Sequence, residues 1–315
     1  MVLLGIDLGG TKLALALFDQ KGKILYKESH HLGTRKGAQV GELIVQCFLK
    51  IRDSKIYGDI NSIGISVPGI YRIKTGTVWA PNIQGWDDYA LLNEITSYTG
   101  GIPVTIDSDR ACYILGEVWH GNAKRCKDAI FLAVGTGIGA GILIGGHVLR
   151  GAHDIAGAIG WMALERPFKN EYSDCGCLEN YTSGEGIAKT ARALLNVTKG
   201  YTGYLNAKPI AKINSHDVFA AFDKNDPVAV KVIRWCIEFW GMAAANLVSL
   251  FNPEKIIFGG GVFGPAIPLI PQIKKEAAKW AQPISIHQVT FQSSSLGSDA
   301  GVYGAGYLAL KNIHP

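Results

Sequence analysis

The 315-residue sequence has few charged residues, and they do not cluster in any one segment. Charged side chains make up 18% of the chain, the net charge is only +5, and the lysines and arginines are scattered. A nucleic-acid surface needs grouped side chains that bind phosphates and read bases, so we expect no nucleic-acid partner. Hydrophobic residues reach 48%, which argues against extended disorder and predicts a large buried core.

We predict neither a secretory leader nor a membrane span. The chain enters a strand-like run at Val2, and its six cysteines fit reduced thiols in a cytoplasmic protein. The stretch 129–148 carries no Asp, Glu, Lys or Arg, but its Gly-Thr-Gly-Ile-Gly-Ala-Gly centre interrupts any single helix. Two buried strands joined by a glycine-rich turn explain this stretch better. We therefore expect no membrane contact.

Three glycine turns each follow a buried, apolar strand. They lie at Gly5–Lys12, Val134–Gly139 and Phe258–Val262. Consecutive backbone N–H groups in such turns hold phosphate oxygens, and glycine lets the backbone approach closely. One such turn alone is more often a simple hairpin, but three favour a nucleotide held from several sides. None of them matches a P-loop or a dinucleotide-binding fingerprint.

These turns supply the candidate nucleotide-binding residues. Asp7 lies at a strand end, where it can orient magnesium through water, and Lys12 can neutralise phosphate charge. The alternative for Asp7 is a satisfied polar residue in an ordinary hairpin. The third turn offers a flat backbone platform for an adenine or ribose. The candidates for binding ATP are Asp7, Gly9, Gly10, Thr11, Lys12, Gly135, Thr136, Gly137, Gly260 and Gly261.

A layout of strand, glycine turn and strand occurs twice. It begins at Val2–Asp7 and again at Ala129–Val134, and this repetition predicts two related lobes. Apolar spacing predicts helices at Val40–Ile51, Arg110–Trp119, Pro227–Phe251 and Ala300–Leu310.

The order and spacing of these segments resemble the ROK family of sugar kinases and repressors, nearly end to end. The segments that carry the resemblance are Gly5–Lys12, Ser66–Gly69, Ala80–Asn82, the Asp109 region, Gly135–Gly139, Gly176–Glu179, Asn252-Pro253 and Gly259–Gly261. The resemblance implies an α/β, bilobal actin/hexokinase-like (ribonuclease H-like) duplicated fold with a nucleotide cleft between the lobes. We place a smaller α/β lobe at 1–113, completed by a C-terminal helix at about 300–315, and a larger lobe at 114–299. The family's repressors carry an N-terminal helix-turn-helix, for which the early Asp7 leaves no room.

The resemblance also implies the chemistry, with Asp109 as catalytic base. A carboxylate within hydrogen-bond reach takes the proton of a sugar hydroxyl while the γ-phosphoryl group transfers. Asp109 is also suited to be the N-cap of the following helix. Gly69, Asn82 and Glu179 match sugar-contacting positions of the family, although Asn82 after Pro81 is equally typical of an ordinary turn.

The chain departs from the family where the sugar should bind. The family's Asn before the catalytic Asp is Ser108 here, whose hydroxyl can still donate to a sugar oxygen at shorter reach. The family's Gly-Glu-Ile-Gly-His segment is Gly157–Trp161 here, with Ala158 in place of the Glu. Trp161 either stacks on a sugar face or fills volume left by a missing zinc loop, and large aromatic residues favour packing.

The zinc loop itself is reduced. Only Cys175 and Cys177 remain of its cysteines, and Trp161 replaces its His. A structural zinc site uses four ligands, so we predict no zinc and no other metal held by protein ligands alone. Burial as small apolar groups is the alternative use of these cysteines.

The sequence thus predicts a sugar kinase that uses ATP and Mg²⁺. Its expected acceptor is the 6-hydroxyl of a hexose, amino sugar or glycoside, and the resemblance suggests a homodimer or homotetramer. The alternative is a catalytically weak relative that binds a sugar or nucleotide. The intact Asp7, Asp109 and glycine turns favour the kinase, whereas Ser108, Ala158 and Trp161 favour the alternative. The sugar itself is left open.

Overall fold

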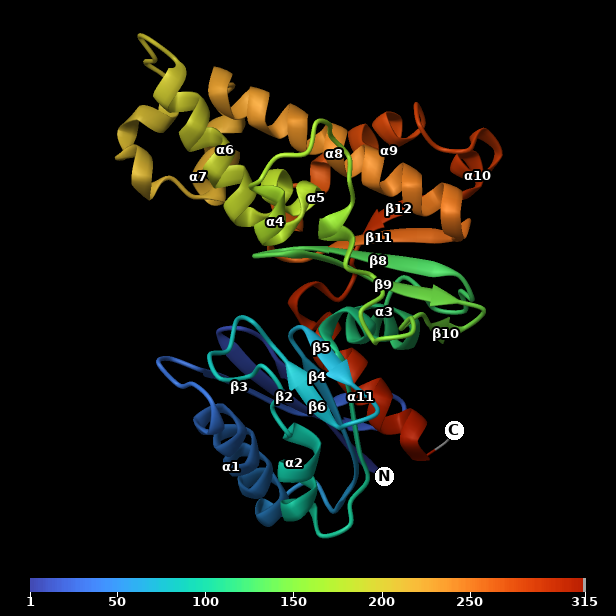
Figure 1. Cartoon of the computed structure of the whole chain (residues 1–315). Helices are drawn as coiled ribbons and strands as arrows, with labels where there is room; N and C mark the ends of the chain where they lie inside the picture. The colour runs from blue at the N-terminus through green and yellow to red at the C-terminus, as the bar shows by residue number, and fades with distance from the viewer. Residues whose placement is uncertain (314–315) are drawn as a thin grey trace. The chain divides into compact units, whose positions relative to one another are not determined.

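The computed structural model describes residues 1–313, and the chain forms two compact units (Figure 1). The first unit comprises Met1–Arg125, Val148–Ala156 and the chain from Ser295 onward, and the second comprises Cys126–His147 and Gly157–Ser294. The boundary predicted at 113/114 differs from this division, because it would cut the single helix α3 (Asp109–Trp119). The return of residues 148–156 to the first unit was not predicted. Residues 314–315 of the predicted final helix lie outside the described part.

The first unit is built on a five-stranded sheet of order β3-β2-β1-β4-β7. Its strands are β1 (Val2–Leu8), β2 (Lys12–Asp19), β3 (Ile24–His31), β4 (Ile60–Val67) and β7 (Val104–Ser108). The first three strands are antiparallel neighbours, whereas β4 runs parallel to β1 and β7 parallel to β4. A small hairpin pairs β5 (Ile70–Arg72) with β6 (Thr77–Trp79).

Apolar residues on the two faces of this sheet pack under different helices. Leu4, Ile6 and Leu8 join the core formed with α1 (Ala38–Ser54) and α2 (Leu91–Thr99), whereas Leu3 joins a cluster with α11 (Ala300–Ile313). This alternation follows from the two-residue period of a strand.

Helix α11 packs against the sheet and α3 with almost no space between the backbones. A Cβ atom on Gly64 would lie 1.9 Å from the carbonyl oxygen of Ala305, and one on Gly304 would lie 1.8 Å from that of Cys112. No side chain fits at such distances, so only glycine allows the contact. The small residues of the predicted C-terminal helix therefore serve close packing.

The second unit repeats the topology of the first. Its sheet has the order β10-β9-β8-β11-β12, again with the third, second, first, fourth and fifth strands side by side. The strands are β8 (Ala129–Val134), β9 (Ile138–Ile144), β10 (His147–Val148), β11 (Lys255–Gly259) and β12 (Thr290–Ser293). Strand β9 is antiparallel to β8, and β11 and β12 continue in parallel, as β4 and β7 do. The predicted duplication is confirmed.

Helices cover the second sheet. They are α4 (Tyr172–Cys175), α5 (Cys177–Thr182), α6 (Gly184–Val197), α7 (Ser215–Phe222), α8 (Pro227–Phe251), α9 (Ile270–Ala277) and α10 (Pro283–Gln288). Helix α8 has the predicted bounds, because Asp226 caps its first N–H groups and Asn252 ends it in a left-handed conformation. Within residues 1–313, no helix is both long and apolar enough to cross a bilayer.

Candidate nucleotide and sugar site

Acidic residues gather at one edge of the first sheet. Asp7 on β1 is in register with Ser66 on β4, and Ser66 with Asp107 on β7. Asp109 follows β7 directly as the first residue of α3. Because the carboxyl ends of parallel strands meet at one edge, the acids predicted for magnesium and for catalysis come from the ends of β1 and β7, the two strands that flank β4.

Burial perturbs both of these acids. It raises the pKa of Asp109 from 3.8 to about 6, with the nearby charge of Asp7 adding to the rise and Arg110 opposing it. Burial also raises the pKa of Asp7, against the lowering effects of the Ser66 hydroxyl and the Lys12 charge. Half-buried carboxylates with raised pKa values are typical of proton-transfer sites.

The start of α3 is fixed by Ser108, which is its N-cap. The Ser108 hydroxyl accepts a hydrogen bond from the Ala111 N–H at 3.3 Å. The capping role considered for Asp109 is therefore wrong. The Asp109 carboxylate instead accepts from the Arg110 N–H at 2.8 Å. The hydroxyl proton and the second lone pair of the Ser108 oxygen are left for a contact with sugar.

The Gly69 turn is tied to the same helix. The Arg110 guanidinium donates to the Gly69 carbonyl oxygen at 3.2 Å. Gly69 has φ of 101°, and a Cβ there would lie 2.2 Å from the Trp79 carbonyl oxygen, so this position requires glycine. The predicted sugar-contacting turn is thus held beside the predicted base.

The first glycine turn joins β1 to β2 and is closed by a hydrogen bond from the Gly9 N–H to the Lys12 carbonyl oxygen, 2.8 Å long. Thr11 and Lys12 are exposed. A Cβ on Gly10 would lie 3.2 Å from the Cβ of Asn82. Asn82 is exposed too, so a residue predicted for the sugar lies against the turn predicted for phosphate.

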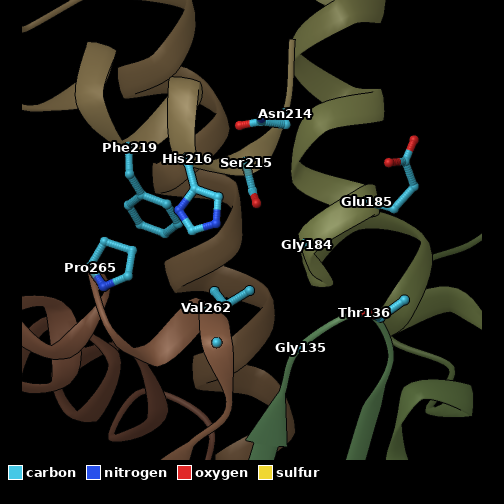
Figure 2. Close-up of a pocket in the computed structure, with 11 residues that line it drawn as sticks. Gly135, Thr136, Gly184, Glu185, Asn214, Ser215, His216, Phe219, Val262 and Pro265 are labelled. Atoms are coloured by element: carbon cyan, nitrogen blue, oxygen red, sulfur yellow. The ribbon is translucent and has the colours of Figure 1, made fainter. Parts of the chain in front are cut away.

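In the second unit, a cavity of about 330 Å³ opens beside the other two glycine turns. Its lining consists of Gly135, Thr136, Gly184, Glu185, Asn214, Ser215, His216, Phe219, Gly261, Val262 and Pro265. Figure 2 shows Phe219, His216 and Pro265 gathered on one side, with Thr136 and Glu185 across from them. The structure therefore brings together Gly135, Thr136 and Gly261 as predicted candidates.

Two predicted glycines lie next to the cavity and outside its lining. Gly260 has φ of 88° and packs against the end of β8, where a Cβ would lie 2.4 Å from the Val134 carbonyl oxygen. Gly137 lies beside Glu179. These two glycines shape the turns around the cavity.

The chemistry of the cavity fits the uncharged part of a nucleotide. Among its lining residues only Glu185 and His216 carry ionisable side chains, and none is Lys or Arg. The buried Phe219 and Val262 add apolar surface. Ligand sites of this kind are mostly apolar with few polar groups.

The sequence-based prediction missed most of this lining. Residues 184–185 begin helix α6, and 214–219 begin helix α7. Asn214 and Asp217 form a capping box, a readable sign of a helix start. That sign locates the helix, but nothing local indicates that the helix start meets turns far away in the sequence.

Glu179, another predicted sugar contact, lies on α5 against the second glycine turn. Its carboxylate accepts a hydrogen bond from the Ile138 N–H at 2.6 Å, and a Cβ on Gly137 or Gly160 would lie 3.0 or 2.8 Å from that carboxylate. Burial raises the pKa of Glu179, and the Ile138 hydrogen bond opposes that rise. Its free carboxylate oxygen can accept one more hydrogen bond.

Comparison with known proteins identifies the relatives of this chain. The family model described as ROK family matches residues 3–312. The chain belongs to the ROK family. The glucokinase of Halalkalibacterium halodurans is 33% identical, with 96% of this chain and 93% of that protein covered. A putative xylose repressor from Caldicellulosiruptor sp. is 28% identical, with 99% of this chain and 79% of the repressor covered.

The crystal structure of a ROK family glucokinase from Streptomyces griseus in complex with glucose and AMPPNP matches with a TM-score of 0.78. Its sequence is 28% identical, and the match covers 99% of this chain and 100% of that one. The predicted family and the actin/hexokinase-like fold class are confirmed.

This ROK protein exposes the tryptophan that replaces the family's His. Trp161 is the last residue of the short 3-10 turn Ile159–Trp161 and is 57% exposed. The packing role favoured for it from sequence is therefore wrong, because most of its ring surface faces solvent. Stacking on a ligand is compatible with this exposure.

The two cysteines of the reduced zinc loop lie on successive short helices. Cys177 is buried, whereas Cys175 is partly exposed, and its thiol lies 3.9 Å from the Gly176 carbonyl oxygen. Neither belongs to a group of three close potential metal ligands in the described part of the chain. The absence of zinc stays a prediction.

Proposed function

We propose that this ROK protein transfers the γ-phosphoryl group of ATP to the 6-hydroxyl of a hexose, amino sugar or glycoside. The observation that carries the proposal is the half-buried Asp109 at a strand edge shared with Asp7, with its pKa raised to about 6. The predicted enzyme class, a sugar kinase, is confirmed by end-to-end matches to glucokinases. The AMPPNP complex of a relative supports the use of ATP.

Asp109 is the base in this reaction. With a pKa of about 6, about nine-tenths of its carboxyl groups are ionised at pH 7. The carboxylate takes the proton of the sugar hydroxyl as that oxygen bonds to the γ-phosphorus and ADP leaves. Ser108 and Arg110 hold the start of α3 in place, so the base is positioned before the sugar arrives.

The cavity of the second unit takes the adenine and ribose. Phe219 and Val262 give it apolar surface, and the exposed His216 can hydrogen-bond to the base or sugar edge. The Thr136 backbone N–H supplies a donor for phosphate oxygens, whereas the Gly135 N–H already donates to the Gly137 carbonyl oxygen at 2.9 Å and closes the turn. Mg²⁺ bound with ATP would neutralise phosphate charge, and the half-buried Asp7 carboxylate, an oxygen donor of the type Mg²⁺ prefers, would hold it.

The sugar contacts are assigned to Asn82 and Glu179, with Trp161 stacking on a sugar face. The Ala158 side chain cannot accept a hydrogen bond from a sugar hydroxyl. This chain therefore lacks the hydrogen bond by which the family's Glu at this position recognises its sugar. An aromatic face prefers an apolar sugar surface or a substituent. Glycosides and substituted sugars therefore belong in the search for the substrate.

Release of ADP, measured by a coupled assay over a panel of hexoses, amino sugars and glycosides, tests the proposal. We expect one class to stimulate ATP turnover, and Asp109→Asn to abolish the stimulation. ATP binding without stimulation by any sugar would instead support the weak binding relative.

A further inference from the structure

Three potential metal ligands converge in the first unit, between the edge strand β3 and helix α1. Glu28 and His30 alternate on β3 opposite Leu15 and Leu13 of β2. These leucines belong to the core under α1, which also contains Cys47. Since residues paired across strands share a face, Glu28 and His30 point toward α1. Ligand atoms of Glu28, His30 and Cys47 all lie within 4.8 Å of one another.

Two of these atoms are buried without a hydrogen-bond partner. The Glu28 Oε1 and the His30 Nε2 lie 3.3 Å apart, and neither has another polar partner. Tetrahedral zinc with bonds of about 2.0–2.1 Å to N and O separates two ligands by about 3.3 Å. The observed spacing matches that of two ligands on one ion. The Cys47 Sγ lies within 4.8 Å of both atoms and would have to move closer to bind the same ion.

The remaining contacts of Glu28 resemble an outer shell. Its other oxygen, Oε2, accepts hydrogen bonds from the Tyr26 hydroxyl at 2.7 Å and the Lys50 ammonium at 3.0 Å. These two hydrogen bonds orient the carboxylate with Oε1 turned to His30, and ligands are commonly fixed around metals by outer partners of this kind.

We propose that Glu28, His30 and Cys47 bind a zinc-like divalent transition-metal ion through Oε1, Nε2 and Sγ, with water as fourth ligand. Sulfur and nitrogen donors select such ions over Mg²⁺ and Ca²⁺, which take oxygen. A neutral imidazole with a carboxylate and a thiolate balances the ion's charge. The ion would link β3 to α1. Strand β3 is one outer strand of this sheet, and β7, which precedes Asp109, is the other.

An ion pair between His30 and Glu28 is the competing explanation, in which Cys47 serves only as a buried side chain of the core. A cysteine that binds a metal does so as the thiolate. Thiolate ligation therefore separates the two explanations.

The test is a Co²⁺ titration of the chelator-treated full chain, followed by thiolate-to-cobalt charge-transfer absorption. We expect a band that saturates at one ion per chain, is displaced by Zn²⁺, is absent in Cys47→Ala and is retained in the control Cys175→Ala. Tyr26→Phe keeps all three ligands and should weaken affinity about 10- to 100-fold.

The half-exposed His30 provides a second variant in case Cys47→Ala does not fold. His30→Ala should lose binding by equilibrium dialysis while keeping its circular dichroism. Zn²⁺ should raise the thermal unfolding midpoint of the wild type and leave that of His30→Ala unchanged. No thiolate band in the wild type, or a band lost only in Cys175→Ala, would overturn the proposal.

Discussion

Replacing Asp109 by Asn should remove activity and stabilise the protein at the same time. The Asn side chain has nearly the same volume, and its carbonyl oxygen can still accept the Arg110 N–H hydrogen bond. It cannot accept the sugar's proton, so turnover should fall about 100- to 10,000-fold. The affinity for ATP should hardly change, because a base acts in the transition state.

The gain in stability follows from the raised pKa. Each pKa unit corresponds to about 1.4 kcal/mol, so the difference between 3.8 and about 6 amounts to about 3 kcal/mol against folding at neutral pH. The N-terminal end of the α3 helix dipole stabilises the negative charge of Asp109 by about 0.3–1 kcal/mol. The neutral Asn variant loses this stabilisation. We expect a net gain of about 2 kcal/mol for Asp109→Asn.

The pH dependence of this gain has a definite sign. Between about pH 4 and 6 the unfolded chain has lost the Asp109 proton while the folded protein retains it, so the folded wild type loses stability as pH rises through this window. The variant does not titrate here. Thermal unfolding of both proteins should therefore differ at pH 8 and converge near pH 4.

Kinetics of the wild type give an independent check. The acid limb of kcat/KM should show an apparent pKa near 6 and should be absent from the residual rate of Asp109→Asn. A variant with most of its rate intact would contradict the role of Asp109. An equal stability difference at pH 4 and pH 8 would refute the reasoning on burial.

Four other substitutions test separate parts of the structure. Gly135→Ala meets no atom within 4 Å, so stability should change by less than about 1 kcal/mol, while the KM for ATP rises about tenfold if phosphate approaches the backbone there. His216→Ala should raise the KM for ATP about fivefold, the value of one hydrogen bond, with the KM for sugar unchanged. Trp161→Ala should do the reverse, raising only the sugar KM, since the ring is 57% exposed and its loss leaves the fold intact. Gly304→Ala should destabilise the protein by about 3 kcal/mol or more in urea unfolding, because its Cβ would meet the Cys112 carbonyl oxygen at 1.8 Å.

Opposite results would be informative in each case. An unfolded Gly135→Ala would mean that the turn needs glycine for itself, and an unchanged ATP KM in either cavity variant would remove the nucleotide from that cavity. A Trp161→Ala variant with lower stability and normal sugar KM would make the ring structural. A stable Gly304→Ala would show that α11 is not held at backbone distance.

Much of this fold could be predicted because its helices and strands follow from local residue patterns. The apolar run at the start of the chain predicts β1 to within one residue, and the helical spacing of α8 between Asp226 and Asn252 fixes that helix with its ends. The repeated strand, glycine turn and strand predicted the duplication. The position of Asp109 near Asp7 follows once both are known to end parallel strands of one sheet.

The roles of Ser108 and Trp161 could not be predicted, because the sequence allowed more than one role for each. Ser108 caps α3, a place that Asp109 could have taken equally well on composition. Trp161 is exposed although its size favoured burial. Both outcomes depend on how the adjoining chain packs.

By itself the sequence determined the elements, the glycine turns and the acids at strand ends, because each depends on residues within one turn or strand of one another. Only the tertiary structure decided that residues 148–156 return to the first unit and that 135, 184, 216 and 261 line one cavity. It alone placed Cys47 beside Glu28 and His30. The physical reason is that these contacts form by packing between segments far apart in the chain. Local residue propensities carry no information about such packing.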